Sequence, residues 1–336
     1  MSTSKSERCS FARDEHRQQS EYFAKAFPDK ERFRDRVFQL GGKDRLAGLM
    51  GHGKQIEKVF QREKIQWHSY IGHARSSQAC CINFLMPFAD KPEILSRWLE
   101  VLLGAPSPEV LPIERGPNGQ DWFVTFEYTG PNKVDYLGEA GGRAPGRGAN
   151  ATAADAAVAF VDRDGRRQLL LIEWKYTEQY QTHRLSGSNE TRHRRYADKL
   201  FEPNGPISDG HGLVFEDFLF EPVYQLVRQQ MLAWQIEHHP DSGFDRVRVL
   251  HLSPSKNRAL HHITAPGFRQ LSGESFDDVF SAYRACLIDK EAFLNQHIEE
   301  AFGDLASWPD VDWYTALSER YPSLCRASGV GASPDA

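Results

Sequence analysis

Apolar residues recur at helical spacing near the start of the chain. In residues 54–67, Ile56, Val59 and Phe60 fall on one face of a helix. Residues 31–40 show a similar amphipathic pattern. The spacing therefore predicts two amphipathic helices in these segments.

Two further helices are expected before residue 105. Residues 76–88 are mostly apolar and predict a buried helix that ends near Pro87. Residues 91–104 predict another helix, with Gly104 at its end. Residues 1–20 are polar and are expected to be loosely ordered.

The pattern changes to that of strands in the middle of the chain. Residues 121–129 alternate and are rich in aromatic and β-branched side chains, which predicts a strand. Residues 138–150 (GEAGGRAPGRGAN) are rich in glycine and predict an irregular loop. Residues 156–162 and 167–177 flank the turn-forming pair Asp164-Gly165, so we expect a β-hairpin there.

The second half of the chain mixes helices with one more strand. A long polar segment, 180–212, precedes a helix predicted over 221–239, with Pro222 near its first turn. Residues 246–254 predict a strand. Residues 276–303 and a stretch near 310–321 are expected to be helical. The order of helix, strand, hairpin, helix and strand predicts an α/β fold, a mixed central sheet flanked by helices.

Composition narrows the class of protein. The chain has 336 residues and a formal net charge of −5, which argues against a protein that coats nucleic acid uniformly but permits a local basic groove. Its five cysteines are odd in number and form no C-x-x-C pair, so neither a disulfide framework nor a cysteine zinc site is expected. No apolar signal core or membrane-span-length run is present, and we expect a cytoplasmic protein.

The predicted hairpin has charges where its second strand ends. Glu173 and Lys175 point to one face of that strand and Trp174 to the other. A two-residue turn sets Asp155 opposite Trp174, whereas a three-residue loop sets Asp155 opposite Glu173, with side chains about 5 Å apart. We favour the second register, because only it places Asp155 beside Glu173 and Lys175 on one face, where the three charges can act together.

Two carboxylates at this separation need a compensating cation. Lys175 compensates in part, and a divalent ion with oxygen ligands does so more fully. A divalent ion beside a lysine is what phosphodiester hydrolysis requires, because the metal polarises the phosphoryl oxygen and acidifies a bound water. The simpler alternative is a surface ion pair at an exposed strand end.

At these residues the sequence resembles the PD-(D/E)xK nuclease superfamily, which has the restriction-endonuclease-like fold. The resemblance rests on Asp155, the hairpin, and Glu173-Trp174-Lys175, and it extends over about residues 76–255. It departs from the motif at Ala154, which replaces the proline. The resemblance implies a core of helix, three antiparallel strands, helix and strand (αβββαβ). It also implies that Asp155, Glu173 and the Trp174 backbone carbonyl bind Mg²⁺ or Mn²⁺ and that Lys175 is catalytic.

With this resemblance, the expected organisation is a helical extension over 1–75 and a nuclease-like core over 76–265. A helical extension over 266–325 and a disordered tail over 326–336 follow. The expected function is metal-dependent phosphodiester hydrolysis, as an endonuclease acting on DNA. A non-catalytic nucleic-acid-binding or interaction module on the same fold is the alternative. A homodimer is a further possibility that enzymes of the restriction type suggest.

Several other polar residues are candidates for the same site. Glu139 precedes the glycine-rich loop and is a candidate third metal ligand, with Glu127 as its rival; a solvated loop glutamate is the alternative for Glu139. Gln225, Arg228 and Gln229 share one face of the helix after the hairpin. They are expected either to support the metal site or a phosphate, or to form a solvated face.

Basic residues cluster just after the catalytic strand. This cluster, with Tyr196 among the charges, is expected to contact the nucleic-acid backbone, although a solvated charged loop is the alternative. Its members are Arg184, Arg192, His193, Arg194, Arg195 and Lys199. Arg143 and Arg147 in the glycine-rich loop are further candidates for phosphate contacts. The paired histidines His238-His239 and His261-His262 lack the spacing of a structural zinc site.

Overall fold

The structure is a computed structural model that describes residues 10–106, 108–148, 151–180, 182–271 and 273–325. Its α-helices are α2 (Ser10–Ala26), α3 (Gly53–Glu63), α4 (Ser77–Leu85), α5 (Pro92–Leu103), α6 (Asn189–Tyr196), α7 (Val223–Glu237), α8 (Arg258–His261), α9 (Val279–Ala285), α10 (Ile298–Ala301) and α11 (Tyr314–Arg320). Its strands are β1 (Glu109–Leu111), β2 (Glu114–Arg115), β3 (Asp121–Trp122), β4 (Thr125–Tyr128), β5 (Ala154–Val161), β6 (Arg167–Trp174), β7 (Arg246–Ser253), β8 (Gln270–Leu271), β9 (Glu274–Ser275) and β10 (Phe293–His297).

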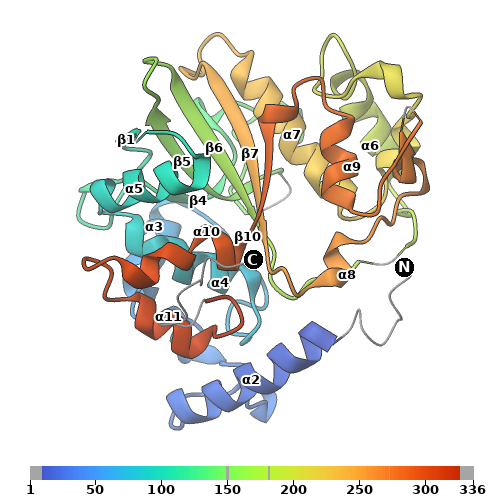
Figure 1. The fold of residues 1–336 in the computed structure, drawn as a ribbon. Helices are drawn as coiled ribbons and strands as arrows, with labels where there is room; N and C mark the ends of the chain where they lie inside the picture. The colour runs from blue at the N-terminus through green and yellow to red at the C-terminus, as the bar shows by residue number, and fades with distance from the viewer. Residues whose placement is uncertain (1–9, 107, 149–150, 181, 272, 326–336) are drawn as a thin grey trace, which may run out of the picture.

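A mixed sheet forms the centre of the molecule (Figure 1). Its strand order is β1-β5-β6-β7-β10, and β4 also pairs with β5. β5 is antiparallel to β1, β4 and β6, whereas β6, β7 and β10 run parallel to one another. The sheet therefore combines an antiparallel hairpin with parallel strands, as the sequence predicts.

Helices cover both faces of this sheet. In Figure 1, α4, α5, α10 and α11 lie on one side of it and α7 and α9 on the other. Alternate residues of β6 divide between the two sides: Leu170, Ile172 and Trp174 join one buried cluster, and Leu169 and Leu171 join the other. Because both faces are covered, the strand is a nearly continuous apolar run.

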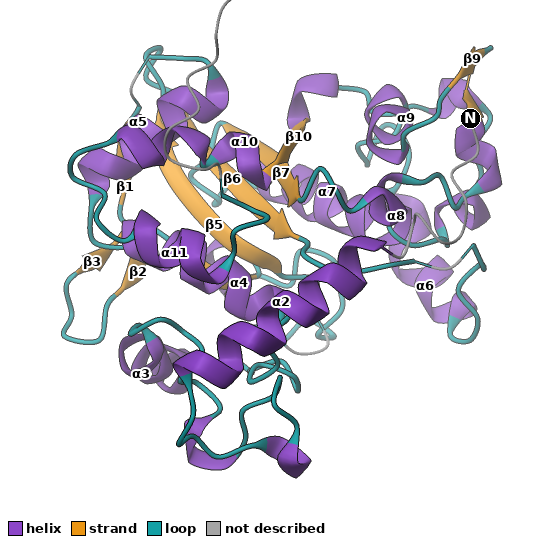
Figure 2. Cartoon of the chain, turned by 60° about the horizontal axis from the view of Figure 1, so that its bottom comes forward, coloured by secondary structure: helices purple, strands orange, loops and turns teal. Residues whose placement is uncertain are grey.

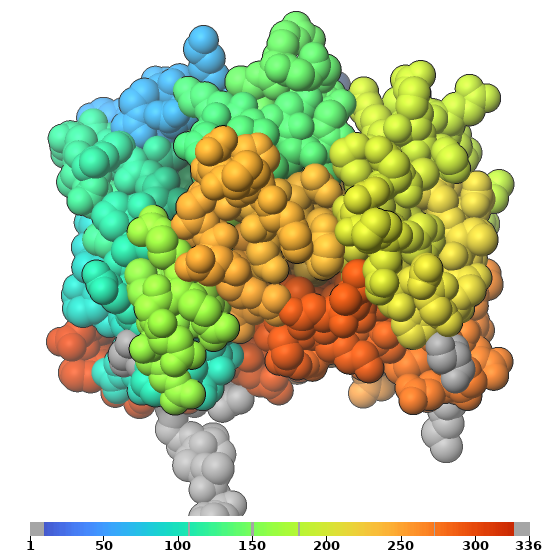
Figure 3. All heavy atoms as spheres, turned by 90° about the horizontal axis from the view of Figure 1, so that it is seen from above, coloured from blue at the N-terminus to red at the C-terminus, as the bar shows by residue number. Residues whose placement is uncertain are grey.

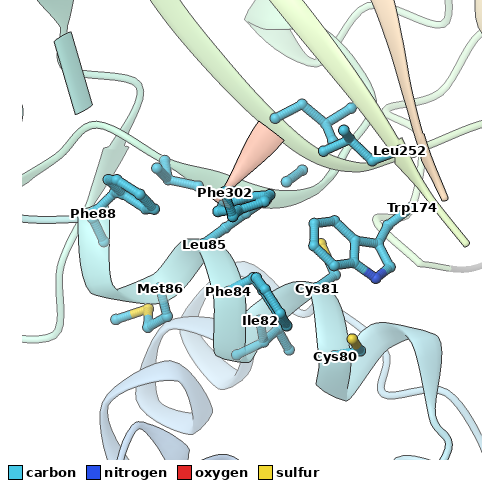
Figure 4. Close-up of a cluster of buried hydrophobic side chains, with 14 of the residues drawn as sticks. Cys80, Cys81, Ile82, Phe84, Leu85, Met86, Phe88, Trp174, Leu252 and Phe302 are labelled. Carbon is cyan, nitrogen blue, oxygen red and sulfur yellow. The ribbon is translucent and has the colours of Figure 1, made fainter. Parts of the chain in front are cut away.

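Trp174 anchors the end of β6 in the first of these clusters. Its ring centroid lies 5.2 Å from that of Phe84 on α4 and 5.8 Å from that of Phe302 (Figure 4). Trp174 and Phe84 are both fully buried. The large aromatic contact area fixes one face of β6 and so directs the neighbouring side chains of Glu173 and Lys175 to the opposite face.

The hairpin has the register that the sequence argument favours. Ala156 pairs with Ile172 and Val161 with Arg167, which places Asp155 opposite Glu173 when the ladder is continued by one residue. Gly165 has φ = 78° and its N–H donates to the carbonyl of Asp162 at 3.0 Å. The left-handed glycine closes a three-residue loop, as expected.

Two predictions about the N-terminal region are wrong. Residues 10–20 belong to helix α2, which lies at the bottom of the molecule in Figure 1 and crosses in front of it in Figure 2. Two of the residues that α2 buries, Glu15 and Gln19, are polar, so hydropathy does not reveal its inner face. Residues 31–40 form a 3₁₀ turn and isolated bridges instead of a helix, and Phe33 and Val37 are exposed.

The expected helix over 276–303 is also only partly formed. α9 and α10 occupy its two ends, but between them β10 runs parallel to β7, with Asn295 opposite His251. The pairing partner is more than forty residues away along the chain, so local spacing does not predict the strand. The segment expected as a C-terminal helical extension thus adds a strand to the central sheet.

The terminal segments share a core with the centre of the chain. One buried cluster includes Phe11, Phe84 and Leu324. The predicted boundaries at 75 and 265 stay predictions, and the tail 326–336 lies outside the described residues. In the part of the chain that is described, no helix is both long and apolar enough to cross a membrane.

Candidate active site

The site begins where β5 and β6 stop pairing. Trp174 donates its backbone N–H to Oδ2 of Asp155 at 2.7 Å. The carboxylate thus replaces the next bond of the β5–β6 ladder. In a β-strand, the N–H and C=O of one residue point to the same side. The Trp174 carbonyl therefore points to the side on which Asp155 lies.

Glu173 and Lys175 form a buried ion pair on one face of the sheet. Lys175 Nζ lies 2.6 Å from Glu173 Oε1, and the two residues are 8% and 5% exposed. Gln229 on α7 donates from Nε2 to Glu173 Oε2 at 2.9 Å and to the Ala153 carbonyl at 2.7 Å. Both oxygens of Glu173 are therefore held, and the surface ion pair considered from sequence is not what forms here.

The charges of this group affect one another. Burial, together with the nearby charge of Glu173, raises the pKa of Asp155 well above its ordinary value. Burial lowers the pKa of Lys175, but the carboxylates around it, Glu173 foremost, outweigh this and hold that pKa well above its ordinary value. Lys175 therefore stays protonated, and its positive charge compensates part of the negative charge of the carboxylates.

Glu127 is a third carboxylate at the same site. β4 pairs with β5 on both sides of it, Phe126 with Ala156 and Tyr128 with Ala154, so Glu127 lies opposite Asp155. Its φ of 51° is in the left-handed region, which a residue with a side chain rarely adopts. Such backbone strain is typical of functional sites.

The Glu127 side chain is held by two polar groups. Oε1 accepts a hydrogen bond from Gln78 Nε2 at 2.6 Å and lies 3.3 Å from Nε2 of His68. Gln78 in turn accepts the backbone N–H of His68 at 3.0 Å. The hydrogen bond with Glu127 raises the pKa of His68, whose side chain is 48% exposed. His68 was not predicted, because a lone histidine in a loop has no sequence signal.

These side chains line one cavity of about 230 Å³. It lies between the ends of the strands, α7 and the loop before α4. Its lining residues are His68, Glu127, Gly148, Ala151, Thr152, Ala153, Asp155, Glu173, Lys175, Gln225, Arg228 and Gln229. All three residues predicted from the polar face of α7 are among them.

The donor set of the cavity suits a hard divalent cation. Carboxylate oxygens of Asp155 and Glu173 and the carbonyl oxygen of Trp174 are the ligand types that Mg²⁺ prefers, and Mg²⁺ keeps several waters as well. Within the described ranges, no group of three or more His, Cys, Asp or Glu side chains is arranged to hold a metal. The fit therefore requires the backbone carbonyl and water in addition to the two carboxylates.

Glu139 lies outside the cavity lining and has other partners. Its Oε1 accepts from Arg228 at 3.0 Å, from the Thr152 hydroxyl at 2.8 Å and from the Tyr196 hydroxyl, and its Oε2 accepts the Thr152 N–H. Both oxygens are thus occupied within the protein. Of the two acidic candidates, Glu127 lines the cavity and Glu139 does not, and the identity of a third metal ligand stays a prediction.

The predicted basic residues divide into two groups. Arg184 and Arg194, near or on α6, are exposed, as is Arg143 in the glycine-rich loop. Arg192, Arg195 and Lys199 are partly buried around α6. These positions leave the exposed side chains available to a ligand.

Arg147 has a structural task instead. It donates to Glu114 Oε2, the Thr125 hydroxyl and the carbonyls of Phe126 and Glu127. Its guanidinium fastens the glycine-rich loop to β4 and is not free for a phosphate.

A comparison with known families gives an independent result. Residues 20–322 match a family described as "Restriction Endonuclease associating with ARP". No curated protein and no solved structure matches the chain. The match confirms the resemblance to restriction endonucleases, and the helix-flanked mixed sheet is consistent with a restriction-endonuclease-like fold. The matched range contains the whole cavity, and the chain belongs to this family of restriction endonucleases.

Proposed function

We propose that this chain is a metal-dependent nuclease that hydrolyses phosphodiester bonds in DNA. The observation that carries the proposal is the convergence of Asp155, Glu173 and Lys175 in one cavity, in a member of a restriction endonuclease family. Asp155, Glu173 and the Trp174 carbonyl are the proposed ligands of Mg²⁺ or Mn²⁺. When bound, the metal supplies charge that polarises the phosphoryl oxygen and acidifies a water molecule.

The chain's own residues have distinct tasks in this proposal. Lys175 presents an ammonium group that orients the attacking water and stabilises charge developing on the phosphate. Gln229 holds Glu173 from α7 and so fixes one carboxylate ligand. Burial of the Glu173–Lys175 pair keeps both groups in one arrangement before substrate binds.

The test is cleavage of DNA by purified protein. Supercoiled plasmid, single-stranded DNA and RNA are incubated with Mg²⁺ or Mn²⁺, and with EDTA as a control. Lys175→Ala is expected to lower the cleavage rate at least about a hundredfold, as loss of one stabilising donor does. Lys58→Ala, which removes an exposed lysine from α3, is the matched control and is expected to leave the rate unchanged.

Two results would contradict the proposal. Equal cleavage by wild type and Lys175→Ala would place the activity elsewhere or in a contaminant. Metal-independent DNA binding without cleavage under any condition would favour the non-catalytic binding module instead.

A further inference from the structure

Helix α6 is joined to the cavity through the residues around Glu139. Tyr196, at the end of α6, and Arg228, on α7, both bond to the same oxygen of Glu139. Arg228 also lines the cavity that contains Asp155. The buried carboxylate therefore fixes the position of α6 relative to the catalytic cavity.

The ring of Tyr224 on α7 continues this connection. The guanidinium carbon of Arg228 lies 5.5 Å from the ring centroid, and that of Arg192, on α6, lies 5.4 Å from it. The two guanidinium groups are thus no farther apart than the sum of these distances. This upper limit is short enough for both guanidinium groups to contact phosphates that are close neighbours on one strand.

Beyond Arg192 the exposed surface of α6 is basic. Residues 182–199 contain five arginine and lysine residues and two acidic residues, although the chain as a whole has a net charge of −5. A second cavity of about 420 Å³ lies there; Arg184, His193 and Arg194 line it together with two acidic residues, Glu190 and Glu216, and with Phe215. The His193 and Phe215 rings meet edge to face with centroids 5.2 Å apart.

The segment that contains these basic residues lies on one side of the molecule in the view of Figure 3. Figure 3 shows the segment from about residue 182 to residue 220 along one side of the upper face, whereas the hairpin turn near residue 165 lies on the other side. The turn contains Arg163 and Arg166, which have acidic partners in Asp164 and Asp162. A phosphate chain that leaves the catalytic cavity therefore finds basic side chains in the direction of α6.

We propose that one nucleic-acid strand runs from the catalytic cavity across Arg228, Tyr224 and Arg192 and onto α6. The second cavity, beside Arg184 and Arg194, holds the backbone of the same strand several nucleotides from the cleaved bond. The inference rests on the proposed nuclease function and deepens it. In this proposal the protein contacts the substrate backbone on only one side of the cleaved bond. Glu139 positions Arg228 and α6 for these contacts.

The test measures binding separately from cleavage. All proteins carry Lys175→Ala, and fluorescence anisotropy gives the affinity for a labelled single strand and a duplex at several salt concentrations. Arg184→Ala/Arg194→Ala removes two charges from the second cavity. Arg163→Ala/Arg166→Ala, the matched control, removes two charges from the hairpin turn.

Each lost phosphate contact lowers the slope of log affinity against log salt by about 0.7 to 0.9. We therefore expect the α6 double variant to reduce the slope by about 1.5 and the hairpin variant to leave it unchanged. Equal slopes for the two double variants would overturn the proposed path. Arg192→Ala, which leaves the second cavity intact, is expected to reduce the slope by about one contact, and an unchanged slope would also overturn it.

A second measurement examines the direction of the path in protein that has Lys175. Cleavable strands are shortened on one side or the other of the cut site. Shortening on one side is expected to lower cleavage at least about tenfold in wild type, and this sensitivity is expected to disappear in the α6 double variant. An equal loss of cleavage on shortening either side of the cut site would refute the proposal that the contacts lie on one side. Absence of any cleavage refutes the nuclease proposal, whereas the anisotropy result still decides the path.

Discussion

Replacing Asp155 by asparagine is expected to make the protein more stable while removing its activity. Asp155 shares the cavity with Glu173 and Glu127, and Lys175 is the nearest compensating cation. Asparagine keeps an oxygen that accepts the Trp174 N–H but removes the charge. The substitution therefore relieves repulsion without breaking the hydrogen bond that ends the β5–β6 ladder.

The magnitude follows from the positions across the sheet. Side chains opposite each other on adjacent strands are about 5 Å apart at Cβ. Two unit charges about 6 Å apart in a medium of effective dielectric constant about 20 interact by roughly 3 kcal/mol. The carboxylates of Glu173 and Glu127 repel that of Asp155, and the ammonium of Lys175 attracts it. The net interaction energy is therefore about that of one repulsive pair, and water at the cavity mouth reduces it further. We expect Asp155→Asn to raise the free energy of unfolding by about 1–3 kcal/mol at neutral pH.

The pH dependence has a definite sign. Burial and the Glu173 charge raise the pKa of Asp155 above its ordinary value of 3.8, so the folded protein holds this proton more tightly than the unfolded chain does. The stability from this group is fully present below the ordinary value and is lost as pH rises through the folded value. Asp155→Asn is expected to remove this loss.

Thermal denaturation in EDTA, from about pH 5 to about pH 8, measures both effects. Asp162→Asn is the matched control, because Asp162 accepts hydrogen bonds from Arg166 and Gln168 and its loss is expected to destabilise. Added Mg²⁺ is expected to stabilise wild type and not Asp155→Asn. A less stable Asp155→Asn protein, or an unchanged pH slope, would show that the carboxylates do not repel one another as argued.

Three further substitutions probe the surroundings of the site. Gln229→Leu removes the donor to Glu173 Oε2, and Mg²⁺ affinity measured by calorimetry is expected to fall about 10- to 100-fold. Arg147→Ala frees the glycine-rich loop from β4, and limited proteolysis is expected to cut within residues 138–148 faster than in wild type. Phe84→Ala leaves a cavity against Trp174, and denaturant titration is expected to show a loss of about 3–5 kcal/mol. Unchanged values in these assays would contradict the respective contacts.

The hairpin was predictable because its information is local. Asp164-Gly165 and the alternation around it predict the turn but allow two loop lengths, and the charges of Asp155, Glu173 and Lys175 favour the one that the structure has. Placement of Glu173 and Lys175 on one face follows from the period of a strand alone. These elements needed no knowledge of distant parts of the chain.

The wrong prediction for the N-terminal segment and the unforeseen partner of Glu139 both involve residues whose environment is set by distant parts of the chain. α2 buries Glu15 and Gln19, whose partners include Tyr176 and the Arg320 carbonyl, so its polar inner face resembles a solvated one. Glu139 lies beside the glycine-rich loop, as expected, but its partner Arg228 is 89 residues away. The spacing of residues near α2 or near Glu139 does not indicate these distant partners.

The polar residues at the site belong to a row that crosses the sheet. Glu127, Asp155 and Glu173 continue into His251 on β7 and Asn295 on β10. His251 Nδ1 lies 3.0 Å from Asn295 Oδ1, and burial lowers the pKa of His251 to about 3, so this end of the row is neutral at pH 7.

The positive charge beside the carboxylates therefore comes from Lys175, because the histidine next to Glu173 is uncharged. Arg228, the other cation of the cavity lining, already has Glu139 as a partner. The carboxylates of Glu127, Asp155 and Glu173 therefore have one buried cation without a partner outside the group, the ammonium of Lys175. The half-exposed His68 is the other basic side chain beside them. A buried site with this imbalance is costly when empty and favours a divalent cation. The cost of placing Glu173 and Lys175 at the end of an apolar strand is therefore understandable as the cost of the cation site that we propose.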